Sequence, residues 1–242
     1  MTDVQPFRAF RPDLGRTGTL TAVVCPPREE LRPERLAALR AHPVNAAHLL
    51  ADGAGAALRA WLRDDLLIQD SARCLYLVEQ DVADGATTFT RRGFLARVRI
   101  EAAPADNDWL PLIRETHMNA QPAMALYPDA DPLGVLTKAV GRLPPLEVDD
   151  PRGGKCRLWA VSDQHAISAV QGLMGQLTLT VVSGAAMLAA AAAYRDERVA
   201  QGEAEEESAP VRFAMMLLVG ETEPGPNRAP LAGLAYHSLR GI

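Results

Sequence analysis

The sequence has 242 residues, of which 48% are hydrophobic and 23% are charged; this balance excludes a wholly disordered or fibrous chain and fits one large domain or two small ones. The net charge is −5, and 25 basic residues are interspersed with 30 acidic ones, so we expect no nucleic-acid partner. No run of 18 apolar residues and no secretory signal is present, which predicts a cytoplasmic protein that does not enter a membrane.

The first third of the chain predicts one strand and two helices. Residues 20–24 form a β-favouring run before a Pro-Pro turn, which predicts a short strand. Pro33 can occupy the first turn of a short helix that ends near His42, because a missing N–H costs nothing there. In residues 57–66, apolar side chains recur every three or four positions, and this spacing indicates an amphipathic helix.

The next segment has the two-residue period of β-strands. Residues 74–79 and 87–91 flank the turn dipeptide Asp84-Gly85, and in residues 93–101 apolar side chains alternate with others such as Arg97. This pattern predicts an antiparallel meander with one solvent-facing side.

Helices and strands alternate from there on. Residues 106–117 predict a helix, residues 122–127 an extended segment, and residues 131–141 a second helix with Asp131 as its N-cap. Residues 144–155 are polar and rich in Pro, Gly and Asp, which predicts a loop.

The last third contains a strand, a tight turn and a helix in direct succession. Residues 177–182 predict the strand, Ser183 and Gly184 the break, and residues 185–200 the helix. A helix N-terminus after such a turn often binds phosphate groups. We expect the alanine-rich start of this helix, residues 185–193, to pack closely against the preceding strand.

Three further segments complete the last third. Residues 157–161 predict a strand, and Ser162 or Asp163 can cap the helix that follows. Residues 201–210 predict a solvated acidic loop, and the apolar residues 211–219 predict a central strand. The whole pattern predicts a mixed α/β or α+β fold. We expect two lobes, residues 1–143 and 156–242, with one continuous domain as the alternative.

Cysteine and histidine usage argues against a disulfide framework or a metal site. The three cysteines Cys25, Cys74 and Cys156 are far apart and odd in number, which favours reduced, packed thiols. The five histidines share no ligand spacing, and no Walker A, GxGxxG or GxSxG motif follows a strand. We therefore predict no metal and no cofactor, and assign no catalytic residue.

A series of short segments carries a recognisable pattern: residues 3–8, 23–27, Asn45 with His48, 76–80, 90–94, 114–119, 126–127, 158–161 and 194–198. In this order they resemble an uncharacterised bacterial family known as domain of unknown function 1015. The resemblance covers nearly the whole chain.

In that family a strand ends in Asp-Gly-His-His-Arg before a helix that starts Tyr-Glu-Thr-Ala, a signature similar to ParB-like and serine-kinase folds. The resemblance implies a ParB-like strand-turn-helix in the second lobe, where such groups would converge on phosphate oxygens. The matching stretch here lacks every ionisable group of the motif: Ser183 stands for the aspartate, Ala185 and Ala186 for the histidines, Met187 for the arginine and Ala189 for the glutamate.

Two further departures agree with this loss. The family's His-Glu-Arg-Thr stretch has no counterpart in residues 101–106, and its Pro-Thr-His-Arg segment survives only as His237 within residues 235–238. The resemblance therefore implies a degenerate member with no catalytic residues.

Our leading hypothesis is a non-catalytic protein that binds a small anionic ligand or a protein partner. The candidate ligand-binding residues are Ser183, Gly184, His237, Arg8 and Asn119. Each has a plainer interpretation as well: a helix cap and turn for Ser183 and Gly184, ion pairing for Arg8, and packing for His237.

The alternative hypothesis is an active phosphotransferase similar to the serine kinases. It would use ATP, ADP or pyrophosphate and would depend on residues outside the motif, such as Asp81, Glu101, Asp106 or His237.

Overall fold

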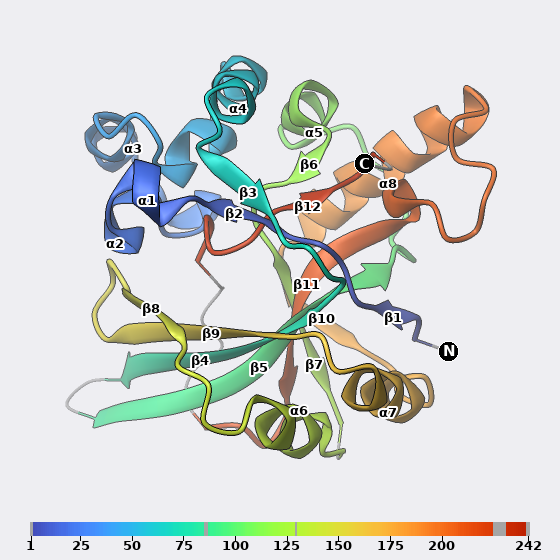
Figure 1. The fold of residues 1–242 in the computed structure, drawn as a ribbon. Helices are drawn as coiled ribbons and strands as arrows, with labels where there is room; N and C mark the ends of the chain where they lie inside the picture. Colours follow the sequence, from blue (N-terminus) through green and yellow to red (C-terminus); the bar gives the residue numbers. More distant parts are fainter. Residues whose placement is uncertain (1, 85–86, 129, 225–230, 241–242) are drawn as a thin grey trace.

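The computed structural model describes residues 2–84, 87–128, 130–224 and 231–240. The main strands are β1 (Val4–Gln5), β4 (Leu75–Asp84), β5 (Thr87–Arg99), β7 (Ala123–Tyr127), β8 (Leu146–Asp149), β9 (Lys155–Val161), β10 (Thr180–Ser183) and β11 (Phe213–Gly220). They form one eight-stranded sheet in the order β10-β7-β11-β5-β4-β9-β8, with β1 paired to β5 (Figure 1). β11 and β7 are parallel and the other pairs are antiparallel. The predicted mixed α/β fold is confirmed.

Two small sheets lie over one face of the main sheet. One pairs β2 (Phe10–Pro12) with β3 (Leu67–Gln69), and the other pairs β6 (Met118–Asn119) with β12 (His237–Ser238). Figure 1 shows both above the main sheet, beside most of the helices.

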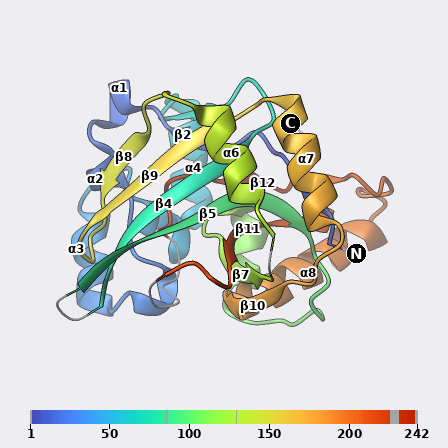
Figure 2. The same ribbon diagram turned by 90° about the horizontal axis from the view of Figure 1, so that it is seen from below.

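The helices cover both faces of the main sheet. α6 (Pro132–Val140) and α7 (Gln164–Met174) pack together on the face opposite the small sheets (Figures 1 and 2). The remaining helices are α1 (Leu14–Thr17), α2 (Leu20–Val23), α3 (Pro33–Arg40), α4 (Ala54–Arg63), α5 (Leu110–Thr116) and α8 (Ala185–Ala200), with 3₁₀ turns η1 (Arg28–Glu30), η2 (Ala46–Leu50) and η3 (Pro210–Arg212).

Several local predictions are confirmed. α3 starts at Pro33, and the apolar period of residues 57–66 corresponds to α4. Asp131 and Asp163 cap α6 and α7, because their carboxylates accept from the N–H of Gly134 at 2.7 Å and of Ala166 at 2.8 Å. The apolar run 211–219 supplies β11, which is buried between β7 and β5 in the middle of the sheet.

Two predicted elements are wrong in type or length. Residues 20–24 do not form a strand, because Leu20–Val23 is one turn of helix. The side-chain amide of Asn45 donates to the carbonyls of Ala22 and Val24 at 2.7 and 2.9 Å, and these bonds hold the turn against the β preference of its residues. The helix predicted over residues 106–117 starts only at Leu110.

The segment 144–155 is not a plain loop, since it contains β8 and leads directly into β9. Strands from both sides of this segment share the main sheet. The division into two lobes stays a prediction.

The prediction of a solvent-facing side on β5 is also wrong. Leu95 and Arg97 are only 2% and 7% exposed, while their neighbours on the other face are buried as well. The N-terminal segment and the small sheets cover the face that carries Arg97, and no local sequence pattern reports such a covering layer. Gly85, half of the turn dipeptide predicted between β4 and β5, lies outside the described residues.

The start of α8 is less tightly packed than predicted. The predicted strand is shorter, Thr180–Ser183, and it is the edge strand of the sheet. Ala190, Ala191 and Ala192 are buried, but Ala185 and Ala186 are exposed. Only the middle of the alanine-rich segment therefore lies against the core.

The three cysteines are buried and free, as predicted. None of the described helices combines the length and the apolar character that crossing a membrane requires. Within the described residues, no group of three or more His, Cys, Asp or Glu side chains could hold a metal ion.

Candidate functional site

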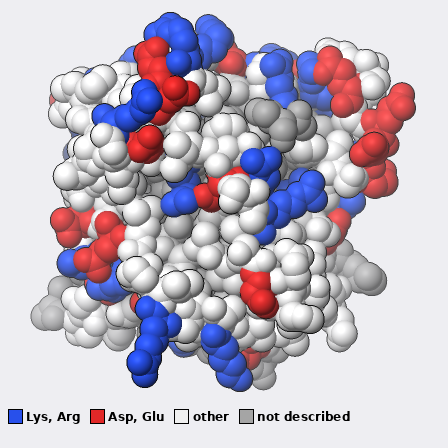
Figure 3. Space-filling model, viewed as in Figure 1, with Lys and Arg blue, Asp and Glu red and all other residues white. Residues whose placement is uncertain are grey.

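A pocket of about 360 Å³ opens on the face that carries the small sheets. Four arginines from four separate segments line it: Arg8, Arg73, Arg97 and Arg240. We call it the arginine pocket. Among the described residues, none of these four arginines forms an ion pair with a carboxylate. Basic side chains gather near the middle of this face, over β12 and the start of β11 (Figure 3).

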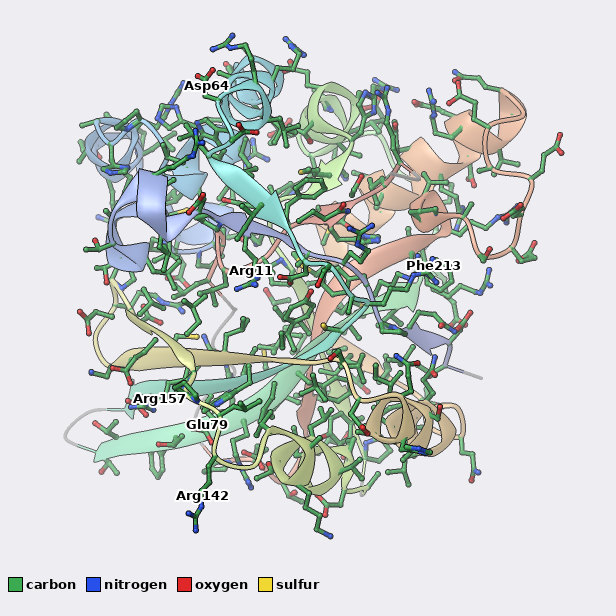
Figure 4. All side chains as sticks on the ribbon, in the orientation of Figure 1. Arg11, Asp64, Glu79, Arg142, Arg157 and Phe213 are labelled. Carbon is green, nitrogen blue, oxygen red and sulfur yellow. The ribbon has the colours of Figure 1, made fainter. Side chains whose placement is uncertain are left out.

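Arg97 is the most buried of the four, with 7% of its surface exposed. Its Nε nitrogen has no hydrogen-bond partner among the described residues. The guanidinium lies over the ring of Phe213, 4.7 Å from the ring centre, and Figure 4 labels that phenylalanine. Burial and the nearby Arg73 lower the pKa of Arg97. Asp3 raises this pKa, but it lies beyond ion-pair distance of Arg97. The side chain is thus a desolvated cation with no ion pair among the described residues, an arrangement that costs free energy in the absence of a ligand.

Arg99, two residues along the same strand, is an arginine whose charge is paired. Its guanidinium lies over the ring of Phe213 as well, at 5.0 Å. Unlike Arg97, it forms ion pairs with Asp3 at 3.1 Å and with Glu207 at 2.9 Å. The two arginines share a strand and an aromatic partner, but only Arg99 forms ion pairs.

Arg8 is oriented by a backbone contact that leaves its charge uncompensated. Its Nε donates to the backbone carbonyl of Asp70 at 2.7 Å. The carboxylate of Asp70 faces elsewhere, because it accepts from Arg11 and, at 2.7 Å, from the hydroxyl of Tyr76. Asp70 therefore holds Arg8 in place without neutralising it.

Arg240 is exposed and bound to His117, which ends α5 with a left-handed φ of 53°. The Nη2 of Arg240 lies 2.6 Å from the Nε2 of His117. Since a guanidinium can only donate, Nε2 accepts, and the ring hydrogen is on Nδ1, beside the hydroxyl of Tyr194. Burial, with Arg240 and Arg198, lowers the pKa of His117 to about 4. His117 is therefore neutral near pH 7.

His237 lines the pocket from β12 and is 2% exposed. Its Nδ1 lies 3.1 Å from Oδ1 of Asn119, and that oxygen also accepts from the N–H of Met215 at 3.1 Å. Burial, and to a lesser degree Arg97, lowers the pKa of His237 to about 3. The imidazole is therefore neutral near pH 7 and adds no positive charge to the pocket.

The structure brings three of the five predicted site residues together. Arg8 and His237 line the arginine pocket, and Asn119 lies directly behind His237. Ser183 and Gly184 do not line it. Gly184 has a φ of 82° at the N-cap of α8, and its backbone packs against Ala123 so closely that a Cβ would lie 2.8 Å from the Ala123 Cα.

Three of the four arginines were missed from the sequence. Arg97 was assigned to a solvent-facing side of its strand, because the alternating pattern does not report the segments that cover this face. Arg73 and Arg240 lie outside regular elements, and no local pattern distinguishes them from solvated arginines.

A second pocket of about 300 Å³ has the opposite character. It lies at the end of β5 and is lined largely by apolar side chains, among them Leu179, Leu188 and Met216. Its one arginine, Arg99, is already paired with Asp3 and Glu207. Glu101, a candidate of the phosphotransferase hypothesis, also lines this pocket. Among the described residues, the pocket therefore holds no arginine that is free to bind an anion.

The family described as "Protein of unknown function (DUF1015)" matches residues 4–231 of the chain. This match spans most of the chain, including β5, β11 and three of the four arginines of the pocket. No curated protein and no solved structure matches the chain.

Proposed function

The chain belongs to the DUF1015 family of proteins of unknown function, and from that premise we propose that it is a non-catalytic binding protein whose arginine pocket holds a small anionic ligand. This proposal rests on the burial and the unpaired nitrogen of Arg97. A guanidinium that is 7% exposed, has an unbonded Nε and forms no ion pair among the described residues lowers the stability of the free protein. An anion bound beside it would remove that cost.

The surroundings of Arg97 support an anion rather than a neutral ligand. Three further arginines line the same pocket, whereas its acidic lining is the exposed Glu206. Charge-assisted hydrogen bonds contribute about 1.5–3 kcal/mol each, so two of them would give dissociation constants between millimolar and tens of micromolar.

The absence of catalysis is supported by the residues that a phosphotransferase would need. Positions 183 and 185–187, which match the family's charged motif, hold Ser, Ala, Ala and Met. Asp81, a candidate for the alternative hypothesis, bonds to Thr90 at 3.0 Å and pairs with Arg157. Glu101 and Asp106, the other carboxylates of that hypothesis, do not line the arginine pocket. His237 does, but its Nδ1 is engaged by Asn119.

Binding is tested by calorimetry of the purified chain with inorganic phosphate and pyrophosphate at pH 7.5. We expect saturable binding that is lost in Arg97→Met and retained in Arg99→Met. Arg99 is a matched control because it lies on the same strand and the same aromatic ring but outside the pocket. Equal binding by the wild type and Arg97→Met would contradict the proposed site.

The non-catalytic character is tested by incubating the chain with serine and each of ATP, ADP and pyrophosphate. We expect no phosphoserine and no loss of the phosphate donor. Turnover that survives purification and disappears in His237→Gln would instead favour the phosphotransferase hypothesis, because His237 belongs to its candidate residues and lines the pocket.

A further inference from the structure

The arginine pocket has more positive charge than one monovalent anion can balance. Four guanidinium groups line it, together with a single carboxylate among the described residues, that of Glu206. The repulsion between these groups is already apparent at Arg97, where Arg73 helps to lower the pKa. A ligand with a single negative charge would leave most of this repulsion in place.

The donors also point to more than one anionic group. Arg8 is held through Nε by the carbonyl of Asp70, so its two Nη groups remain for a ligand. Arg240, near the other end of the chain, donates through Nη2 to His117 and has further N–H groups that can donate to a ligand. Arg97 is stacked on Phe213, which leaves the in-plane N–H groups as its polar contacts. These cations come from separate segments, and a volume of about 360 Å³ exceeds the needs of a single ion.

We propose that the arginine pocket binds an oxyanion compound with two or more negative charges on separate groups, as in a diphosphate or a polycarboxylate. This inference rests on the proposed function and adds the chemical class of the ligand. At constant ionic strength, the affinity should rise with the charge of the ligand, and this rise should disappear when Arg97 is replaced.

Replacement of Glu206 tests whether a negative charge at the pocket weakens the binding of anions. It is exposed on the acidic segment that follows α8, and it lines the pocket without an ion pair among the described residues. Its carboxylate repels an incoming anion, and the repulsion grows with the charge of the ligand. Glu206→Gln should therefore strengthen binding of pyrophosphate by more than it strengthens binding of acetate.

The experiment is calorimetry on the full chain at pH 7.5 and fixed ionic strength, with acetate, inorganic phosphate, pyrophosphate, succinate and citrate as probes. We expect pyrophosphate or citrate to bind at least about tenfold more tightly than acetate, because each added charge-assisted contact is worth roughly a factor of ten or more. The phosphate and carboxylate probes distinguish the two group chemistries. Arg97→Met should lose this preference, and Arg99→Met should keep it.

A second variant guards against a folding defect in Arg97→Met. Arg73 is exposed, so Arg73→Gln should leave the melting temperature unchanged and weaken pyrophosphate several-fold. If acetate and pyrophosphate bind equally, and both depend on Arg97, the polyanion inference is wrong while the proposed function stands. If no probe binds, or if binding is indifferent to both Arg97→Met and Arg73→Gln, the proposed function itself is wrong.

Discussion

Replacement of Arg97 by methionine should make the ligand-free protein more stable. An unpaired buried N–H costs about 1–3 kcal/mol, and methionine removes it while it keeps most of the side-chain length. The loss of the contact with Phe213 offsets about 0.5–1 kcal/mol of this gain. The net expectation is a stabilisation of about 1 kcal/mol, which corresponds to a rise of roughly 2–4 °C in the melting temperature for a chain of this size.

The same substitution should reverse the order of stability when ligand is present. At a pyrophosphate concentration of about 100 times the dissociation constant, binding adds about 2.7 kcal/mol to the wild type, and it adds nothing to a variant that cannot bind. Urea unfolding of both proteins with and without pyrophosphate measures the crossover. Arg97→Met should be the more stable protein in buffer and the less stable one with ligand.

Arg99→Met is the control for this experiment. It removes two partly exposed ion pairs, with Asp3 and Glu207, and the contact with Phe213, so it should lower the free energy of unfolding by about 1–2 kcal/mol and keep the full ligand-induced gain. The reasoning would be refuted if Arg97→Met lowered the stability of the ligand-free protein by more than about 2 kcal/mol, because Arg97 would then be a satisfied structural residue.

Three further predictions concern the rest of the molecule. Burial raises the pKa of the Cys25 thiol to about 12, so an aromatic disulfide reagent at pH 8 should label the native protein far more slowly than the urea-unfolded chain, and fast native labelling would contradict the packing. Gly184→Val should destabilise the protein by about 1–3 kcal/mol more than Gly202→Val, since both residues have positive φ but only Gly184 meets Ala123; equal melting temperatures would show that this contact yields freely. The folded pKa of His237, about 3, lies below that of the unfolded chain, so its contribution to stability is complete above pH 6.5 and falls by about 1.4 kcal/mol from pH 7.5 to pH 5.5. His117, with a folded pKa of about 4, adds a similar loss, so urea titrations should find the total loss about halved in His237→Gln.

The elements that could be predicted are those in which one local signal dominates. The apolar period of α4 and the carboxylate caps at Asp131 and Asp163 do not depend on distant residues, and they are found where the sequence places them. Residues 20–24 failed because two hydrogen bonds from Asn45, more than 20 positions away, decide their conformation. Propensity is overridden wherever a tertiary contact of this strength intervenes.

The residues of the candidate site also fall into those that could be predicted from the sequence and those that could not. Arg8, Asn119 and His237 were singled out through the family resemblance, and they are neighbours in space although up to 229 positions separate them in the chain. Arg97 and Arg240 had no such support. The burial of Arg97 arises from the small sheets that cover β5, and this covering depends on the fold as a whole.

Met187 and the arginines of the pocket place different groups around His237. Met187 is 2% exposed, and its sulfur lies 3.7 Å from the side-chain nitrogen of Asn119, the residue that holds His237. An arginine at this position would place a cation behind the imidazole, whereas methionine places an apolar group there. The positive charge lies at the pocket itself, on Arg97 and its neighbours. An unpaired, buried cation lowers stability in every ligand-free molecule, so its presence is accounted for most simply if binding an anion offsets that cost.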